Sequence, residues 1–429
     1  MRLNWFSPLP PARTGVARYT AALLPALRRV AQITVWTDQA VWDQSLEQHA
    51  SVRRYDADRL PWAELNRADA TVYHLGNEAR FHAPILAVSR QLPGVVVLHD
   101  LCLQYLFTAL YRDRNDRDGY LELVRRHHGS AGATAAAAHW DGIGTIEDVA
   151  ELYPLTRPAL ARALSVVVHT REAFERLRRD ERRPVAYIAL PHPAAAGRVA
   201  APAQPPFRLI CFGHIGPNRR IDALLEALAQ FPDRARFRLA IYGEVWERER
   251  LRRRIYSLGL ASLVTLHGFI DDAALADALA DAHLAINLRY PTMGEASLSQ
   301  LQIWDHALPS LVSSAGWYAG LPPDTVAFVR PEQERADLQA HLGAFLDDPD
   351  RFARMGLNGR RRLETQHAPD DYARAVVDVA ATAAAFHPQA VAFELAERVG
   401  VELGRWLTPA STPDTLRRIA EEIEALTRA

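Results

Sequence analysis

The chain has 429 residues, which is too long for one ordinary hydrophobic core, so two domains are expected. Its hydrophobic (49%) and charged (24%) fractions are typical of a globular protein, and its net charge of −1 gives no overall field that would recruit nucleic acid. All 50 basic residues are arginine, which indicates an Arg-biased bacterial sequence and excludes a lysine Schiff base or a lysine-dependent phosphate loop.

The two cysteines, Cys102 and Cys211, lie in apolar segments and form neither a CxxC motif nor a zinc spacing. The N-terminus lacks the apolar core of a signal peptide, so we expect a reduced, cytoplasmic protein. No apolar run reaches 18 residues, and a membrane-spanning helix is therefore not expected.

Short apolar runs alternate with amphipathic segments along the chain, which predicts a parallel α/β architecture. An amphipathic helix is predicted at 14–29, and an Ala-rich segment at 129–140 reads as a helix or a mobile loop. In the first half, the expected strands are 2–6, 32–36, 70–75, 94–100 and 164–170. Residues 191–206 are rich in Pro and Ala and are interpreted as a linker.

After this linker the alternation begins again, which suggests a second Rossmann-like domain. Its expected strands are 207–213, 237–243, 263–269, 283–288, 309–314 and 325–329. From about residue 369 the sequence is helical, with expected helices at 370–386, 390–407 and 413–429.

Ligands of open parallel sheets bind beyond the carboxyl ends of the strands, so site residues are expected in the segments that follow the strands. Gly15 opens a helix after the first strand, where bare backbone N–H groups suit a phosphate or a hydroxyl. A tight strand-to-helix turn without a ligand is the alternative, and the local sequence favours it because no GxGxxG motif is present. His99 and Asp100 close the strand at 94–100, and His99 is interpreted as facing the site.

In the second half, Gly213 and Gly216 flank His214, and Arg219 and Arg220 follow at the start of an amphipathic helix. Cations at a helix N-terminus oppose the helix dipole unless an anion lies there, and a diphosphate would satisfy both. Arginines that point into water are the alternative.

Glu295 follows the strand at 283–288 and precedes a helix whose first turn is expected to be 296–299, made of small residues that let a ligand approach the backbone. A carboxylate that merely complements the helix dipole is the alternative.

Several of these segments resemble the retaining glycosyltransferases of family 4. They are 7–27, 73–85, 95–104 and 166–177 in the first half, and 212–228, 239–244 and 263–300 in the second. The resemblance covers roughly residues 1–400. It implies the GT-B fold, with two facing Rossmann-like domains and a cleft between them. Residues 1–190 would bind the acceptor, 207–375 would bind the nucleotide sugar, and helices in 376–429 would pack back on the first domain.

The resemblance also implies roles for individual residues. The diphosphate-binding Arg and Lys of the family fall on His214 and Arg219, beside Gly213. The family's Glu-x7-Glu motif is broken here: counting from Glu295 puts Ile303 at the second acid, whereas aligning residues 306–309 puts Gly294 at the first and Gln302 at the second. In either alignment Glu295 would face the donor sugar, and Gln302 could hydrogen-bond the ribose. The backbone of Ala296, Ser297, Leu298 and Ser299 would receive the phosphates, while Gly15 and His99 match the glycine of the acceptor loop and the strand-end histidine.

The implied reaction moves a hexose from a nucleotide diphosphate sugar to a saccharide or lipid-linked acceptor with retention, in polysaccharide biosynthesis. No metal is required where arginines and a helix end balance the diphosphate. A peripheral contact with the inner face of the membrane is compatible with this role. Two other functions stay open: a non-catalytic nucleotide-sugar-binding subunit of a partner glycosyltransferase, and a GT-B epimerase or phosphorylase.

Overall fold

The computed structural model describes residues 1–180, 183–194, 205–406 and 413–425. By their contacts the residues divide into two compact units. Unit 1 comprises Met1–Ile188 with Asp370–Ala429, and unit 2 comprises Ala189–Pro369. Most of the expected linker, 191–206, lies outside the described residues.

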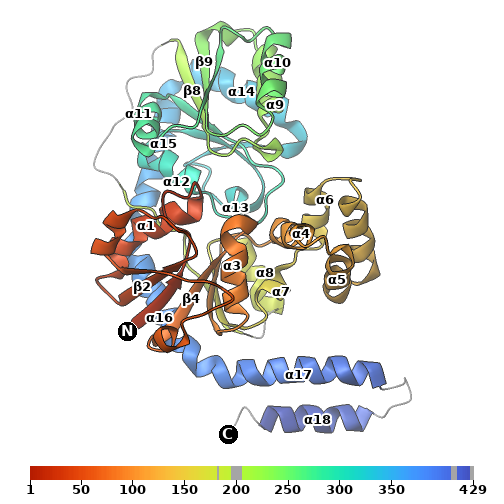
Figure 1. Ribbon diagram of the computed structural model, residues 1–429. Helices are drawn as coiled ribbons and strands as arrows, with labels where there is room; N and C mark the ends of the chain where they lie inside the picture. Colours follow the sequence, from red (N-terminus) through yellow and green to blue (C-terminus); the bar gives the residue numbers. More distant parts are fainter. Residues whose placement is uncertain (181–182, 195–204, 407–412, 426–429) are drawn as a thin grey trace. The chain divides into compact units, whose positions relative to one another are not determined.

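Unit 1 is built on a seven-stranded parallel sheet whose strands follow the order β3-β2-β1-β4-β5-β6-β7 (Figure 1). The strands are β1 (Arg2–Phe6), β2 (Gln32–Thr37), β3 (Ser51–Arg54), β4 (Ala70–Leu75), β5 (Gly94–Leu98), β6 (Ala163–Val168) and β7 (Val185–Tyr187). The central strands β5 and β6 are buried along their whole length, as strands covered by helices on both faces must be.

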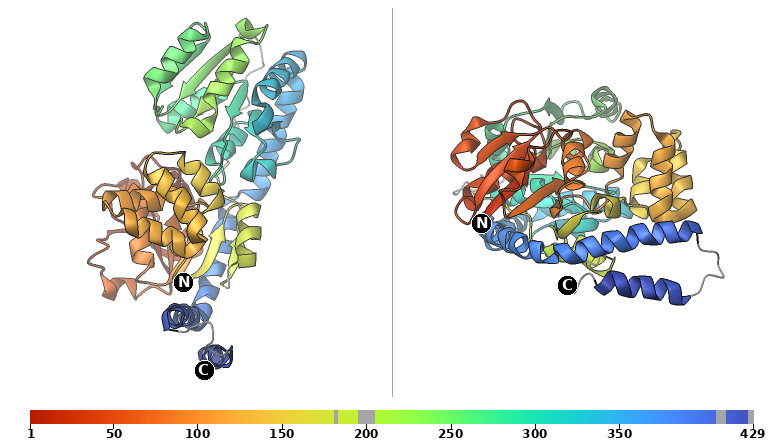
Figure 2. Two further views of the ribbon diagram at one scale, coloured as in Figure 1. Left: turned by 90° about the vertical axis from the view of Figure 1, so that its right-hand side faces the viewer. Right: turned by 60° about the horizontal axis from the view of Figure 1, so that its bottom comes forward.

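The helices of unit 1 come from both ends of the chain. They are α1 (Gly15–Leu27), α2 (Trp62–Leu65), α3 (Ala79–Ser89), α4 (Gln104–Asp113), α5 (Arg117–Trp140), α6 (Ile146–Leu152), α7 (Thr156–Ala159), α8 (Arg171–Asp180), α16 (Pro369–Ala383), α17 (His387–Trp406) and α18 (Pro413–Ala425). The Tyr19 hydroxyl on α1 donates to the Tyr372 hydroxyl on α16 at 2.6 Å, which fixes α16 to the body of the unit. Helices α17 and α18 form a hairpin (Figures 1 and 2).

Unit 2 contains a six-stranded parallel sheet in the order β10-β9-β8-β11-β12-β13. Its strands are β8 (Phe207–Phe212), β9 (Phe237–Tyr242), β10 (Val264–Gly268), β11 (Leu284–Asn287), β12 (Ser310–Ser313) and β13 (Ala327–Val329). Its helices are α9 (Ile221–Ala229), α10 (Arg248–Ser257), α11 (Asp272–Asp281), α12 (Leu298–Asp305), α13 (Gly316–Ala319), α14 (Glu334–Asp347) and α15 (Pro349–Gln366). Each of the six strands expected in this half of the sequence is present.

Alternate residues of β8 enter cores on opposite faces of the sheet, because side chains alternate along a strand. Leu209 and Cys211 of β8 join one core with α9, α10 and α14. Ile210 and Phe212 join the other core, with α11 and α12. The sheet is therefore sandwiched between helices, and its carboxyl edge is left for loops.

The structure adds two strands to those expected from the sequence, decides one open alternative and corrects the start of one helix. Strands β3 and β7 are additional, because SVRR, with four residues, and VAY, with three, are too short to be recognised from periodicity. The Ala-rich segment 129–140 belongs to α5, which is kinked at Gly129. Helix α12 begins at Leu298 with Ser297 as its N-cap, so Ala296 is not part of its first turn.

Within the described parts of the chain, no helix combines the length and the apolar character needed to cross a membrane.

Helix α12 is held against α15 by the close approach of Gly359 to Trp304, and a Cβ at Gly359 would overlap the indole ring. The Trp304 Nε1–H also donates to the Thr325 carbonyl oxygen at 3.2 Å. This packing sets the position of α12, whose N-terminal end lies at the carboxyl edge of the sheet.

We expect Gly359→Ala to lower the free energy of unfolding by about 1–3 kcal/mol, because the indole must move. Gly343→Ala in α14 is the matched control: a Cβ there meets nothing within 4 Å. This control should be neutral or slightly stabilising, because alanine favours helix over glycine. Urea denaturation measures both variants, and equal stability of the two would contradict the packing role of Gly359.

Candidate functional site

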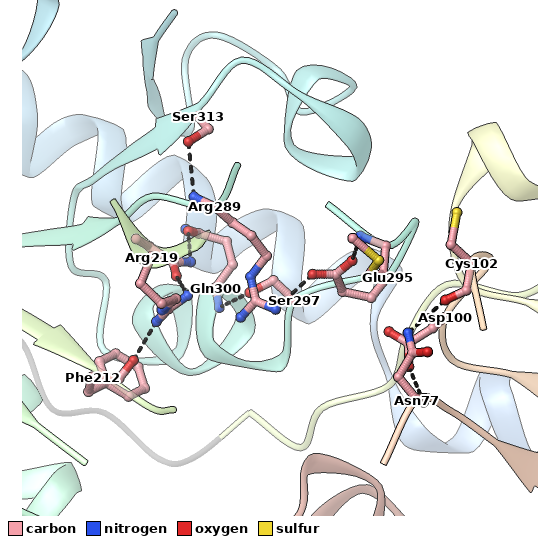
Figure 3. A network of polar contacts seen from close by, with 12 residues as sticks. Asn77, Asp100, Cys102, Phe212, Arg219, Arg289, Glu295, Ser297, Gln300 and Ser313 are labelled. Atoms are coloured by element: carbon pink, nitrogen blue, oxygen red, sulfur yellow. Dashed lines mark hydrogen bonds and ion pairs between the residues drawn. The ribbon is translucent and has the colours of Figure 1, made fainter. Parts of the chain in front are cut away.

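A buried arginine joins two neighbouring strands at the carboxyl edge of the unit 2 sheet (Figure 3). Arg219 is only 3% exposed. One of its NH groups donates to the carbonyl oxygen of Phe212, the last residue of β8, and the other donates to Asn287 Oδ1 at 2.9 Å, at the end of β11. Its Nε has no hydrogen-bond partner among the described residues. Arg219 therefore lies at the junction of β8 and β11.

This junction is the topological switch point of the sheet. From β8 the chain winds through β9 and β10 on one side, and β11 then lies against the other side of β8. In open α/β sheets, the crevice at such a point is where ligands bind. The predicted phosphate-binding arginine is therefore at the position where this architecture favours a ligand.

A chain of buried amides and hydroxyls, which sequence reasoning missed, supports Arg219. Asn287 Nδ2 donates to Gln300 Oε1 at 2.9 Å, and Gln300 Nε2 donates to Ser310 Oγ at 2.8 Å. Asn287, Gln300 and Ser310 are all nearly inaccessible to solvent. Asn287 thus accepts from the guanidinium, and its own amide N–H donates to Gln300 of α12. Gln300 is in turn held by Ser310 of β12.

A second arginine, Arg289, lies close to Arg219 and also escaped sequence reasoning. Arg289 NH1 forms a 2.7 Å ion pair with Glu295 Oε1, and the Arg289 backbone N–H donates to Ser313 Oγ at 2.9 Å (Figure 3). The Met293 N–H donates to the other oxygen of Glu295 at 2.7 Å. Both oxygens of Glu295 are therefore engaged, and its side chain is 13% exposed.

Charge accumulates at this edge. Burial lowers the pKa of Arg219, the positive charge of Arg289 lowers it further, and Glu295 opposes the shift. Two guanidinium groups thus gather beside the carboxylate of Glu295 in a partly desolvated place. An incoming anion would relieve the repulsion between the two arginines.

Gly213 lies beside these arginines. Its φ of +110° is a backbone conformation that favours glycine. A Cβ there would lie 3.5 Å from Arg219 NH2 and 3.8 Å from Ser299 Oγ, so Gly213 lies between the guanidinium and the start of α12. His214 next to it is exposed.

Arg220 does not belong to the group formed by Arg219, Arg289 and Glu295. It donates twice to the carboxylate of Glu334 on α14, with both distances 2.7 Å, and this contact raises the pKa of Arg220. The anion that balances Arg220 at the start of α9 is thus a side chain of the protein. The interpretation that this arginine requires a ligand is wrong.

The other expected donor residues line the same loop and helix. Ser297 accepts from the Gln300 N–H at 3.1 Å as the N-cap of α12, and Ser299 and Leu298 form its first turn. Ala296 is half-buried beside Glu295. Gln302 is half-buried as well, and its carbonyl oxygen lies 2.9 Å from His306 Nδ1.

The residues expected on the acceptor side lie in unit 1. Gly15 begins α1 and is exposed, with Thr14 as the N-cap. Asp100 follows β5, and its Oδ2 accepts from the Asn77 N–H at 2.8 Å (Figure 3). His99 belongs to a group of rings at the ends of β4, β5 and β6. Its Nε2 atom lies 3.0 Å from Nδ1 of His74.

The histidine rings of this group are held neutral. Burial lowers the pKa of His74 and of His99 well below the usual 6.5, and His169 adds to both shifts. Burial also lowers the pKa of His82, whose Nδ1 lies 3.0 Å from the His74 carbonyl oxygen, to about 4. His74, His82 and His99 are thus uncharged at neutral pH, and they interact through hydrogen bonds of neutral rings.

Comparison with known proteins supports a glycosyltransferase. Residues 198–362 match the family model described as "Glycosyl transferases group 1", which covers most of unit 2. No curated protein matches the sequence.

Solved structures match over nearly the whole chain. Sucrose-phosphate synthase from Thermosynechococcus elongatus has a TM-score of 0.63 at 17% identity, covering 88% of this chain and 98% of that one. HepE from Anabaena, in complex with UDP and glucose, has a TM-score of 0.59 at 13% identity, covering 88% and 99%. WaaG, a glycosyltransferase involved in lipopolysaccharide biosynthesis, has a TM-score of 0.56 at 15% identity, covering 89% and 99%. The expected α/β GT-B fold is confirmed.

The buried histidines predict a loss of stability in weak acid. Their folded pKa values lie below 6.5, so the unfolded chain takes up protons first as the pH falls. The stabilisation is complete above pH 6.5 and decreases toward about pH 4. Between about pH 7.5 and 5.5, each such histidine should reduce the free energy of unfolding by about 1.4 kcal/mol.

Urea denaturation at the two pH values checks this, and His82→Asn should reduce the difference by about one histidine's share. Identical unfolding midpoints at both pH values would contradict neutral burial of the cluster.

Proposed function

We propose that the protein is a retaining glycosyltransferase. It would move a hexose from a nucleotide diphosphate sugar to a saccharide or lipid-linked saccharide acceptor in polysaccharide biosynthesis. The observation that carries the proposal is the pair Arg219 and Arg289 beside Glu295 at the switch point of unit 2. The family match of this unit and the UDP complexes of HepE, a protein of the same fold, support a nucleotide sugar as the ligand.

Diphosphate binding is the role proposed for the arginines. Arg289 is the more accessible of the two, with 24% of its side chain exposed, and it would contact the phosphates directly. Arg219, which lies beside Gly213, would stabilise the phosphates as a fixed positive charge. It is held by hydrogen bonds to the ends of β8 and β11. The free N–H groups at the start of α12 would complete the site.

This arrangement suits the departure of a diphosphate. Breaking the anomeric C–O bond moves negative charge onto the phosphate and builds positive charge on the sugar. Arginines that are already in place stabilise the first charge without reorganisation, which is the most effective form of electrostatic catalysis. The departing phosphate can accept the proton of the acceptor hydroxyl, so the transfer needs no strong protein base.

Glu295 has two roles in this proposal. Before donor binding it neutralises Arg289 and holds its guanidinium in position. When the phosphates take its place on Arg289, the carboxylate becomes available to the hydroxyls of the donor sugar. Donor binding would thus exchange one ion pair for another at the same guanidinium.

A non-catalytic donor-binding subunit is the second candidate. It is favoured by the engagement of both Glu295 oxygens in contacts within the protein and by the 3% exposure of Arg219. Such a subunit would bind a nucleotide sugar without turnover. A turnover measurement separates it from the enzyme.

The test is a panel of UDP-, GDP-, ADP- and dTDP-sugars, assayed for binding and for slow release of nucleoside diphosphate. One donor should bind and be hydrolysed slowly. Arg289→Gln should weaken its binding about tenfold or more, through the loss of a charge-assisted contact. Glu295→Gln should lower turnover about a hundredfold.

Arg351→Gln is the control, because Arg351 is exposed on α15 and should leave both quantities unchanged. No binding of any donor would exclude the proposed transferase. Binding without release from the wild-type protein would favour the non-catalytic subunit, and equal turnover of the Glu295 and Arg351 variants would remove Glu295 from the mechanism.

A further inference from the structure

The contact between His74 and His99 defines which ring nitrogen of His99 carries its proton. His74 belongs to β4 and is completely buried, and His99 follows the neighbouring strand β5. His74 Nδ1 and His99 Nε2 are 3.0 Å apart. Between two neutral imidazoles, one of these nitrogens must donate and the other must accept.

The surroundings of His74 select the donor. Its other nitrogen, Nε2, is buried and has no hydrogen-bond partner among the described residues. If Nδ1 of His74 accepted, the ring proton would lie on Nε2 as a buried, unpaired N–H group. Orphaned N–H groups are the rarer kind in protein interiors and cost about 1–3 kcal/mol. His74 therefore carries its proton on Nδ1 and donates it to His99.

This arrangement determines the protonation of the other ring nitrogen of His99, Nδ1. Its Nε2 accepts from His74, so the proton of the neutral ring lies on Nδ1. His99 is only partly buried, unlike His74, and can meet a ligand on this side. We propose that His74 is a positioning residue which holds His99 as the Nδ1–H tautomer, so that His99 offers a hydrogen-bond donor to a sugar oxygen. This inference rests on the proposed glycosyl transfer.

Neighbouring rings hold this arrangement in place. The centre of the Tyr19 ring lies 5.2 Å from that of His99, and the centre of the ring of His169, the residue after β6, lies at the same distance. The Trp5 ring is 4.4 Å from His74. The Tyr19 hydroxyl is occupied by Tyr372, so it does not compete for the nitrogens of His99. A donor fixed in this way can orient a hydroxyl or ring oxygen of the substrate but cannot remove a proton from it.

NMR of the full chain, labelled with nitrogen-15 in its histidines, tests the tautomer directly without requiring activity. His99→Gln assigns the His99 signals. We expect Nδ1 of His99 at the chemical shift of a protonated nitrogen and Nε2 at that of an unprotonated one. The reverse pattern, or a charged ring near neutral pH, would overturn the proposal even if the protein proves to be an active transferase.

Variants of His74 test the positioning role in the active protein. His74→Asn keeps an N–H donor near the place of Nδ1, whereas His74→Leu removes it. Turnover with the donor and acceptor should fall about tenfold to a hundredfold in His74→Leu and stay near the wild-type value in His74→Asn. A folded His74→Leu protein with wild-type turnover, or equal losses in both variants, would overturn the role. If His74→Leu does not fold, the tautomer pattern of the wild-type protein decides.

Discussion

A buried guanidinium at the junction of two strands is the interaction on which the proposed site depends. Arg219 is bound by the end of β8 and by the end of β11, and it can remain charged there because a carbonyl and an amide oxygen accept from it. Burying a cation is costly, so each further contact matters: Asn287 is oriented by Gln300, and Gln300 by Ser310. The sheet edge, α12 and β12 are thus joined by one polar chain.

The remaining features of the site follow from that charge. Arg289 comes two residues after Asn287 and brings a second guanidinium to the same edge, where Glu295 pairs with it. Gly213 lies between Arg219 and the start of α12. These groups all suit a compact dianion better than a neutral ligand. In unit 1, by contrast, the neutral rings around His99 suit the hydroxyl groups of a sugar.

Strand ends were predictable from the sequence, but their partners were not. The apolar runs define β5 and β8 to β13, and the residues that follow these strands include His99 in unit 1 and Arg219 and Glu295 in unit 2. Arg289 looks like any surface arginine until Glu295 is brought back to it across the turn after β11. The bond from Arg220 to Glu334 joins residues 114 positions apart, and single-sequence periodicity carries no signal for it. The pairing of His74 with His99 likewise depends on the register of β4 with β5.

A crystal structure with a bound nucleoside diphosphate tests the central claim most directly. The account predicts the phosphates on the Arg289 guanidinium and at the start of α12, with Glu295 released from its ion pair and Arg219 unmoved between β8 and β11. A nucleotide bound elsewhere, for example in the pocket of about 310 Å³ beside Trp246, with the contact between Arg289 and Glu295 intact, would contradict it.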